Sequence, residues 1–399
     1  MNILFVTFYF PPEVGAPQRR IWEFAQKLKE RGHRVKILTG FPNYPHGKLI
    51  APYRRGLFLR ENMDGLEVLR VFHFFGNRRG KWGRALAEGS FAVSASLAAL
   101  LEPALDIAVV ESPSLLSCWA GVLLKRMRES IFVMHVSDLI PNAAVAVAML
   151  SPGRLTSALD RLANFFYGEA NGLIAITESV GEQLRSKGVA ASKICVIPNG
   201  VDDRYLVGES QCPENGKFRV VYAGTHGRAY NLRTVLEAAR RLPMETFEFE
   251  FIGDGIDRPE LEKEAVSLPQ VKFKGGLTVE NMFERLRQCR AMVVPLADNP
   301  GLEATIPCKM IDAMAVCLPV VLAARKGELV DILRENRAGI VVEPDNPEAL
   351  AKAIQYLQAN PEEAVEMGRR GRTFVQKTRS RSLLVEKLEE MLHEIVAQK

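Results

Sequence analysis

Residues 305–321 read TIPCKMIDAMAVCLPVV, a short helical pattern that leads into an apolar strand pattern. Pro307 suits the first position of a helix, and Lys309 and Asp312 lie three residues apart on one helical face. A lysine in the first turn stands at the positive end of the helix dipole, which is unfavourable unless an anion binds there. The segment therefore indicates a phosphate site, with two solvated surface charges as the alternative.

Short apolar runs rich in Val, Ile and Phe alternate with helical patterns along the whole chain. This alternation is typical of parallel sheets covered by helices and predicts an α/β fold with two Rossmann-like, doubly wound domains. The strands are expected at residues 3–8, 34–39, 66–72, 106–110, 131–135, 173–177 and 194–197, and then at 218–223, 247–252, 271–274, 291–295, 319–323 and 340–342.

The length of 399 residues favours two domains over one core. We predict an N-terminal domain at 1–202, a linker at 203–216, and a C-terminal domain at 217–399 that ends in a helical tail. Ligands of doubly wound sheets bind at the carboxyl ends of the strands, so two such domains facing each other across a cleft suit an enzyme that joins two substrates. The pattern leaves open which domain the tail contacts.

The composition indicates a folded, soluble chain, because 47% hydrophobic and 25% charged residues are not those of a disordered protein. The net charge of +5 is concentrated in the first half, which favours an anionic partner or surface there. The six cysteines and six histidines have no close spacing, so a reduced, cytoplasmic compartment and no metal site are expected. The start, MNILFVTFYF, is typical of a strand rather than a signal peptide.

Two glycine-containing turns follow predicted strands. In PPEVGAP at 11–17, Gly15 would let backbone N–H groups approach a diphosphate or a sugar, although an ordinary turn explains the same residues. VVYAGTHGRAYNL at 220–232 contains Gly224 and Arg228 and is a candidate phosphate loop. It lacks the GKS or GKT of a Walker loop and is not GxGxxG, which disfavours nicotinamide binding.

These segments, together with TES at 177–179, VIPNGVD at 196–202, FIGDG at 251–255 and IPCKMIDAMA at 306–315, resemble the retaining glycosyltransferases of family 4, which have the GT-B fold. HVSDLIPNAAVA and the PxK helix start look most like transferases that build bacterial surface polysaccharides such as colanic acid or O-antigen. The resemblance implies hexosyl or N-acetylhexosaminyl transfer from a nucleotide-sugar, most often UDP-linked, to a glycan or lipid-linked sugar acceptor. No resident cofactor is implied.

The resemblance also implies roles for individual residues. Lys309 falls at the basic residue that contacts the donor diphosphate, and Asp312 at the acidic residue that holds the ribose hydroxyls. Gly15 falls in the glycine loop beside the donor phosphates and the acceptor. His135 or Asp138 falls where the family contacts the transferred sugar.

The chain departs from the family pattern in its second-domain glycine loop. Thr225, next to Gly224, replaces the usual arginine, and a usual lysine is replaced near Tyr230. Arg228 is the expected substitute cation. We expect His226 to be a turn residue rather than a ligand.

The chain also departs from the family pattern just before the helix expected after Pro307. GLEAT at 301–305 stands in place of the family's EGFG, so Ala304 or a displaced Glu303 occupies the position of the first glutamate, with Thr305 beside it. Asp312 is one methylene shorter than the usual glutamate.

The chemistry expected of this site is stabilisation of a departing nucleoside diphosphate. Lys309, Arg228 and the amides of the helix after Pro307 could supply positive potential, and no Asp-x-Asp metal motif is present. The resemblance implies that the departing phosphate itself accepts the proton of the acceptor hydroxyl, so a dedicated base is not required.

Residues 72–101 combine aromatic and basic side chains with an apolar helix pattern. The basic residues are Arg78, Arg79, Lys81 and Arg84, and the helix runs through Leu101. Such a segment can contact an anionic membrane, which would place the protein at the inner face of the membrane; a core helix with a solvated basic loop is the alternative. No signal for nucleic-acid binding accompanies the charge.

Three other functions remain open at this stage. A nucleotide-sugar epimerase would share the fold but need no acceptor. A non-catalytic GT-B subunit that positions a partner transferase would explain the missing arginine and glutamate. A Rossmann oxidoreductase is the weakest of the three, because the dinucleotide fingerprint is absent.

Overall fold

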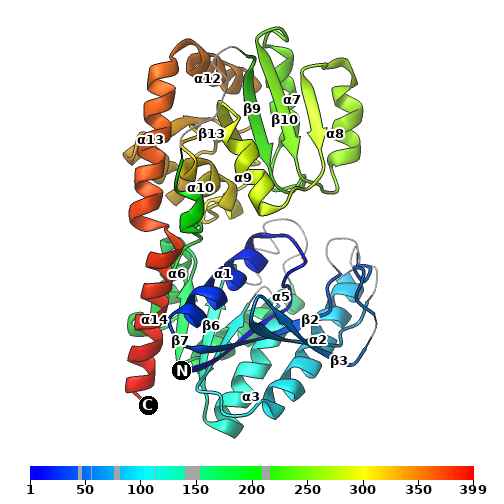
Figure 1. The fold of residues 1–399 in the computed structure, drawn as a ribbon, viewed down its shortest axis with the longest axis vertical. Helices are drawn as coiled ribbons and strands as arrows, with labels where there is room; N and C mark the ends of the chain where they lie inside the picture. Colours follow the sequence, from blue (N-terminus) through cyan, green and yellow to red (C-terminus); the bar gives the residue numbers. More distant parts are fainter. Residues whose placement is uncertain (44–46, 55, 76–80, 113, 140–152, 209–215) are drawn as a thin grey trace. The chain divides into compact units, whose positions relative to one another are not determined.

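The computed structural model describes residues 1–399 except 44–46, 55, 76–80, 113, 140–152 and 209–215. The described residues divide into two compact units (Figure 1). The first unit contains the described residues up to 198 together with 381–399, and the second contains the described residues of 199–380. Each unit is a mainly or wholly parallel sheet covered by helices, which confirms the predicted α/β, Rossmann-like class. The predicted cleft between the domains stays a prediction.

The first unit contains an eight-stranded sheet in the order β3-β4-β2-β1-β5-β6-β7-β8. Every neighbouring pair is parallel except β3 and β4. Its strands are β1 (Asn2–Thr7), β2 (Arg34–Gly40), β3 (Phe58–Met63), β4 (Leu66–Val71), β5 (Ile107–Glu111), β6 (Ile131–Val136), β7 (Gly172–Ala175) and β8 (Ile194–Val196). The seven predicted strands are all present, while the edge strand β3 was not predicted, because FLRENM has no buried face.

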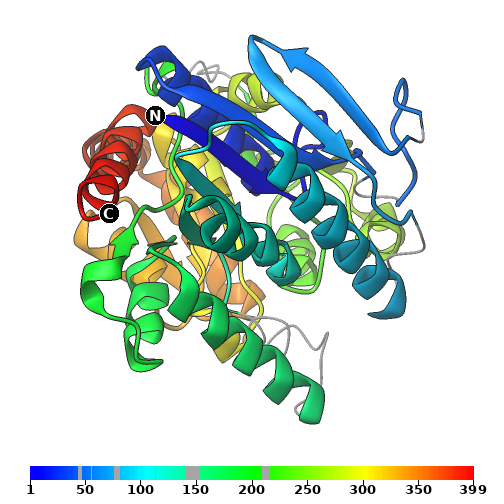
Figure 2. The ribbon, with the colours of Figure 1, turned by 90° about the horizontal axis from the view of Figure 1, so that it is seen from below.

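Helices cover both faces of this sheet. Side chains alternate along a strand, so Ile3 and Phe5 of β1 pack toward one set of helices and Leu4 and Val6 toward the other. The first set is α1 (Ala16–Glu30) and α14 (Arg381–Ala397), and the second is α2 (Lys81–Leu101), α3 (Cys118–Arg128) and α5 (Arg154–Glu169). Figure 2 shows α2 and α3, in cyan and teal, side by side on their face. The short helix α6 (Glu178–Ser186) joins β7 to β8.

The second unit contains a six-stranded parallel sheet in the order β11-β10-β9-β12-β13-β14. Its strands are β9 (Phe218–Ala223), β10 (Phe247–Ile252), β11 (Val271–Lys274), β12 (Ala291–Pro295), β13 (Val320–Ala323) and β14 (Gly339–Val342), and all six were predicted. One face is covered by α7 (Leu232–Arg240), α8 (Arg258–Glu264) and α12 (Pro347–Ala359). The other is covered by α9 (Val279–Arg287), α10 (Cys308–Ala315) and α11 (Glu328–Glu335), with α13 (Pro361–Thr378) packed on α10.

The helical tail ends in the first unit. Arg381 of α14 is buried, its Nε donates to Glu23 Oε2 at 2.6 Å, and its guanidinium lies 4.7 Å from the centre of the Phe24 ring. Leu384 and Leu388 join the same apolar core. The sequence left the position of the tail open, and the structure assigns α14 to the face of the first sheet that α1 also covers.

Each sheet has a point at which the strand order reverses. In the first, β1 is flanked by β2 and β5; in the second, β9 is flanked by β10 and β12. Ligands of open parallel sheets bind beside such a switch point, at the carboxyl ends of the strands. The β1/β5 switch point and the β9/β12 switch point are therefore where functional side chains are expected in each unit.

Candidate active site

The turn after β1 is held by two buried charged side chains. Glu13 accepts hydrogen bonds from the backbone N–H groups of Phe10, at 3.2 Å, and Asn43, at 2.8 Å. Arg70, which is fully buried, donates to the carbonyl of Pro11 at 2.5 Å. Buried charges with partners fix the backbone around them, so this turn has a defined shape before α1 begins.

Gly15 is the N-cap residue of α1, and the side chain of Gln18 packs closely against it. A Cβ at position 15 would stand 2.4 Å from Oε1 of Gln18. Gln18 is buried, and this oxygen has no hydrogen-bond partner among the described residues. A buried amide oxygen without a partner among the described residues, at a helix N-terminus, is a candidate contact for a ligand hydroxyl, while the role of Gly15 itself stays a prediction.

A buried network connects the strand ends at the β1/β5 switch point. Thr7 Oγ1 donates to Glu111 Oε2 at 2.7 Å. Arg20 Nη2 donates to Glu111 Oε1 at 2.5 Å and to Ser137 Oγ at 2.6 Å. Both members of the ion pair are 3% exposed, so the charge of Arg20 is neutralised locally rather than by solvent.

His135, predicted to contact the transferred sugar, belongs to this network. Its Nδ1 lies 3.3 Å from the Ser137 hydroxyl, while Nε2 has no partner among the described residues and the residue is 1% exposed. Burial, and then the positive charge of Arg20, lower the pKa of His135 well below its ordinary value. The ring is therefore neutral at pH 7, with one nitrogen available for a ligand.

Asp138, the other residue predicted for the sugar, follows β6 and is exposed to solvent. The surrounding protein raises the pKa of its carboxyl by desolvation, and the charge of Arg20 opposes this rise. Because water reaches the side chain, the effect on its ionisation is limited. The structure places both residues at the carboxyl end of β6, with His135 buried and Asp138 exposed to solvent.

Two serines at this switch point were not singled out from the sequence. Ser112 and Ser114 follow β5, each is at most 3% exposed, and neither hydroxyl has a partner among the described residues. Buried hydroxyls are normally bonded, so their state favours a polar ligand nearby. The available sequence signal was the ESPS run directly after an apolar strand, at an edge where parallel sheets bind ligands.

In the second unit, the loop after β9 packs closely against the loop after β10. Gly224 has a φ of 145°, and a Cβ on Gly253 would stand 2.1 Å from the carbonyl oxygen of Gly224. A Cβ on Gly255 would stand 2.1 Å from the carbonyl oxygen of His226. The FIGDG motif thus serves as a surface without side chains on which the predicted phosphate loop rests.

Lys309 is the second residue of α10 and points toward this loop, where it lies between two tyrosine rings. Its Nζ donates to the hydroxyl of Tyr222 at 2.8 Å and lies 3.3 Å from the centre of the Tyr230 ring. A Cβ on Gly224 would stand 2.7 Å from Cε of Lys309, so the glycine is needed for the lysine to lie there. The structure therefore brings together Lys309 and Gly224, as predicted, and adds the two tyrosines.

The electrostatics of Lys309 favour an anionic ligand. Among the described residues, no carboxylate forms an ion pair with it, and burial lowers the pKa of its ammonium group well below the ordinary value. Burial likewise raises the pKa of Tyr222 and Tyr230, so both remain neutral hydroxyls. An ammonium group held among aromatic rings gains its missing counter-charge when a phosphate binds.

The other site residues predicted in the second unit differ in their exposure to solvent. Arg228 and Thr225 are both exposed on the loop after β9. Asp312 is buried on α10, one turn beyond Lys309. Glu303 forms an ion pair with Lys326 at 3.4 Å, so its carboxylate is shared with a surface lysine. Thr305 is half-buried just before α10.

His226 combines a turn backbone with a buried side chain. Its N–H donates to the carbonyl of Asp254 at 2.9 Å, and its own carbonyl accepts from the N–H of Asp257 at 3.1 Å. The ring is fully buried beside Phe251 and Phe273, and neither nitrogen has a partner among the described residues. Burial, followed by the charge of Arg258, lowers the pKa of His226 to about 4.

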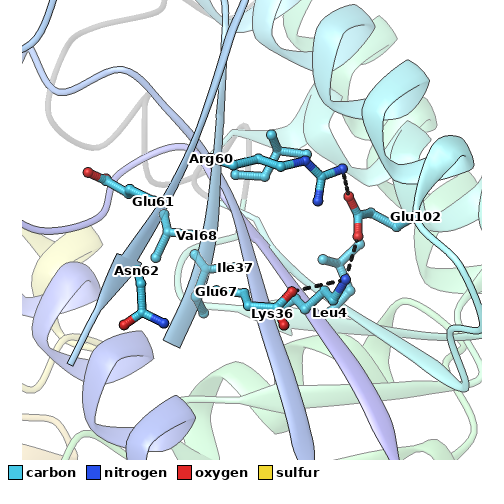
Figure 3. Close-up of a pocket in the computed structure, with 10 residues that line it drawn as sticks. Leu4, Lys36, Ile37, Arg60, Glu61, Asn62, Glu67, Val68 and Glu102 are labelled. Atoms are coloured by element: carbon cyan, nitrogen blue, oxygen red, sulfur yellow. Dashed lines mark hydrogen bonds and ion pairs between the residues drawn. The ribbon is translucent and has the colours of Figure 1, made fainter. Parts of the chain in front are cut away.

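A pocket in the first unit lies at the other end of the strands from the β1/β5 switch point. It is lined by early residues of the parallel strands, including Lys36 of β2 and Glu67 of β4, and therefore lies toward their amino ends (Figure 3). Its charges compensate one another, since Glu102 binds Lys36 at 2.8 Å and Arg60 at 2.7 Å. A pocket with paired charges at the amino ends of a parallel sheet indicates a stabilising network rather than a nucleotide site.

Comparisons with known proteins found family matches in both halves of the chain. Residues 15–200 match the family model described as glycosyl transferase 4-like domain, and residues 217–360 match that of glycosyl transferases group 1. WcaI of Escherichia coli (strain K12), described as a colanic acid biosynthesis glycosyl transferase, is 26% identical over 381 residues, which are 89% of this chain and 91% of that protein. The two family matches together include most of the chain.

Solved structures share the fold over the full length. The sucrose-phosphate synthase of Thermosynechococcus elongatus has a TM-score of 0.79 at 17% identity and covers 100% of both chains. HepE of Anabaena, solved in complex with UDP-glucose, has a TM-score of 0.73 at 16% identity over 99% of this chain and 100% of that chain. Likeness at this level of identity shows the fold, which is GT-B.

Proposed function

This chain belongs to the group 1 glycosyltransferases of family 4, with the GT-B fold, and from that membership we propose a specific reaction. The protein transfers a sugar, with retention and without a catalytic metal ion, from a UDP-linked donor to a glycan or lipid-linked acceptor of bacterial surface polysaccharide synthesis. Two likenesses support the details: WcaI is described as acting in colanic acid biosynthesis, and HepE was solved with UDP-glucose.

The observation that carries the proposal is the position of Lys309 at the β9/β12 switch point. Its Nζ lies within hydrogen-bond distance of the Tyr222 hydroxyl and beside the bare backbone of Gly224. A half-buried cation without a carboxylate partner among the described residues, next to a glycine loop, matches what a diphosphate requires. Asp312, on the same helix, is proposed to accept hydrogen bonds from the donor's ribose hydroxyls.

The reaction needs stabilisation of the leaving nucleoside diphosphate more than it needs a base. As the bond between the anomeric carbon and the phosphate oxygen breaks, the acceptor oxygen forms its bond on the same face of the sugar. The acceptor proton passes to the departing phosphate oxygen, whose new charge Lys309 and Arg228 stabilise. The first amides of α10 add positive potential at the same place.

The β1/β5 switch point supplies neutral contacts in this proposal. His135 is held uncharged and offers Nε2, while Ser112 and Ser114 offer hydroxyls without partners among the described residues. Such groups suit the hydroxyls of a sugar, which carry no charge. Asp138 is the open carboxylate of this set and is assigned to the transferred sugar with His135.

A donor screen tests the proposal. UDP-linked and other nucleotide-sugars are added to the full chain, and thermal shift and mass spectrometry report donor binding and transfer. A UDP-sugar is expected to raise the melting temperature of the wild type, and Lys309→Ala is expected to remove that rise. Lys352→Ala, which removes an exposed lysine of the same unit, is the matched control.

Different results would favour the other functions. Conversion of a UDP-sugar into its epimer without any acceptor would indicate an epimerase. Absence of stabilisation by every donor, with a folded wild-type protein, would indicate a non-catalytic subunit. Stabilisation by a dinucleotide instead of a nucleotide-sugar would indicate an oxidoreductase.

We also propose that α2 contacts an anionic membrane surface on the cytoplasmic side. One face of α2 is buried through Phe91 and other residues, while Leu86, Val93, Leu97 and Leu101 are 57–81% exposed. These four recur at spacings of seven, four and four, so they share one face. The segment Gly83–Leu101 is also long and apolar enough to cross a membrane by length and composition, although a third of it is buried.

Co-sedimentation with liposomes tests this contact. Wild-type protein should sediment with phosphatidylserine-containing vesicles more than with neutral ones. Replacing Arg78, Arg79, Lys81 and Arg84 together by Gln should reduce sedimentation, because in the sequence two of these cations precede Lys81, where α2 begins, and two lie in its first residues. Sedimentation that does not change in the fourfold variant argues against the membrane contact.

A further inference from the structure

Three side chains that can bind metal ions meet at the junction of α14 with the start of β2. His33 precedes β2, and Glu389 and His393 lie on α14, with their ligand atoms within 4.8 Å of one another. His33 Nε2 lies 2.7 Å from Glu389 Oε1, and the two imidazole centres are 6.0 Å apart. The sequence predicted no metal site, because its cysteines and histidines have no close spacing, whereas His33 and Glu389 meet across 356 residues.

We propose that His33, Glu389 and His393 bind one divalent transition-metal ion, with Zn²⁺ as the expected occupant. Two imidazoles and one carboxylate form a ligand set that zinc uses, with water in the fourth position. Glu389 and His393 are four residues apart on α14, so they project from one face of the helix. His33 supplies the third ligand from a different element of the same unit.

The distances require only small side-chain adjustments. Tetrahedral zinc with bonds of ~2.0–2.2 Å holds its ligand atoms roughly 3.3 Å apart. The His33–Glu389 contact at 2.7 Å must therefore widen, and His393 must approach. His393 is exposed, so its imidazole can rotate without disturbing the core.

Neighbouring groups orient two of the ligands. His33 is buried with Nε2 toward Glu389 and Nδ1 3.2 Å from the main-chain nitrogen of Met1, so binding a metal through Nε2 requires Nδ1 to carry the imidazole proton and to donate it to the unprotonated Met1 amine. Arg31 Nε donates to Glu389 Oε2 at 2.6 Å, so Oε1 is the oxygen that faces His33. Outer contacts of this kind hold metal ligands in place, and the ion would replace the hydrogen bond between Nε2 and Oε1.

The proposed ion would fasten the last helix to the first unit. α14 already packs on α1 through apolar side chains and the Arg381–Glu23 pair. A metal bound only by the folded arrangement stabilises it in proportion to the logarithm of metal concentration over Kd. We therefore expect Zn²⁺ to raise the melting temperature of the protein without taking part in sugar transfer.

Metal titration of the full chain, freed of any affinity tag, tests the proposal. Calorimetry with Zn²⁺ should give one ion per chain, and Co²⁺ should give the intense visible absorption of a tetrahedral site. His393→Ala and Glu389→Gln should each weaken binding at least ~10-fold, by loss of a ligand. Glu390→Gln, which changes the exposed carboxylate next to Glu389 on the same helix, should leave affinity unchanged.

Three results would overturn the site. They are no binding at one equivalent, equal affinity in wild type and His393→Ala, and an equal loss in the Glu390→Gln control. Because His393 is exposed, its substitution keeps the fold and makes the comparison valid. Donor binding by the same samples is measured separately, so failure of the metal site is distinguishable from failure of the proposed transferase activity.

Discussion

The buried cation at the β1/β5 switch point, Arg20, is neutralised by Glu111, whereas the cation at the β9/β12 switch point, Lys309, contacts tyrosines and no carboxylate among the described residues. The first arrangement leaves neutral donors and acceptors such as His135 facing a ligand. The arrangement at Lys309 leaves a positive charge that an anionic ligand can neutralise. In the proposed reaction the two sheets would therefore bind different parts of one substrate pair, uncharged hydroxyls in the first unit and a diphosphate in the second.

The largest expected effect comes from breaking the neutral pair in the first unit. Glu111→Gln removes the buried carboxylate that pairs with Arg20, which should lower the free energy of unfolding by about 3–5 kcal/mol. Chemical denaturation measures this loss. Glu67→Gln changes a carboxylate that is 66% exposed and should lower it by less than about 1 kcal/mol. A similarly small loss of free energy of unfolding in both variants would contradict a buried ion pair between Arg20 and Glu111.

Removing the uncompensated cation of the second unit should affect turnover rather than folding. Lys309→Ala should reduce kcat about 10²–10³-fold, as expected for the loss of one group that stabilises transition-state charge. The free energy of unfolding should not fall comparably, because Lys309 forms no ion pair among the described residues. Initial rates with a saturating UDP-sugar test this, with Lys352→Ala as the control. Near-normal turnover in Lys309→Ala would contradict the proposal that Lys309, unlike the paired Arg20, stabilises the charge of the leaving diphosphate.

The lowered pKa of His226 predicts how the stability of the second unit depends on acidic pH. The pKa of its ring is lowered from 6.5 to about 4, so the unfolded state binds a proton first as the pH falls. Its contribution to stability is therefore present above pH 6.5 and is lost between 6.5 and about 4, by roughly 2–3 kcal/mol. His226→Phe keeps an aromatic ring but has no titratable group. The variant should therefore lose roughly 2–3 kcal/mol less stability than the wild type as the pH falls from 6.5 to about 4. Identical acid dependence in the two proteins would contradict the buried, neutral histidine.

The smallest predicted effect concerns the ring beside Lys309. Donor binding requires the protonated lysine, so the KM for the donor should rise as the pH passes the lowered pKa of Lys309. Tyr230→Leu admits water to Nζ and should move that rise to higher pH, changing KM roughly tenfold at the alkaline end. Tyr356→Leu, at an exposed tyrosine, is the control. An unchanged KM profile in Tyr230→Leu would show that the ring does not tune the lysine.

Local pattern was sufficient to predict much of this molecule. Buried parallel strands are continuous apolar runs, so thirteen strands could be located from the sequence, and the order of motifs identified the fold. Lys309 was found because its charge conflicts with the helix dipole. Pro307 was expected inside the helix, but it is the N-cap residue of α10.

The contacts that distinguish the two switch points could not be read from local pattern. Arg20 and Glu111 are 91 residues apart, and Lys309 and Tyr222 are 87 apart. Strand β3 was missed because an edge strand exposed on both faces has no apolar periodicity. Side chains that meet only after the sheet has formed leave no signal in spacing, which is why the tyrosines and the Arg20–Glu111 pair appear only in the structure.

The position of α14 has a consequence for how this protein is made. Arg381 and Glu23 form their ion pair across 358 residues of chain, and the apolar face of α1 is covered in part by α14, which is synthesised only after the whole second unit. Until that helix emerges, the first unit carries an uncovered hydrophobic surface while the whole second unit is being translated. We therefore expect the nascent chain to need chaperone protection late in synthesis, and its solubility to depend on α14 more than the small size of that helix would indicate.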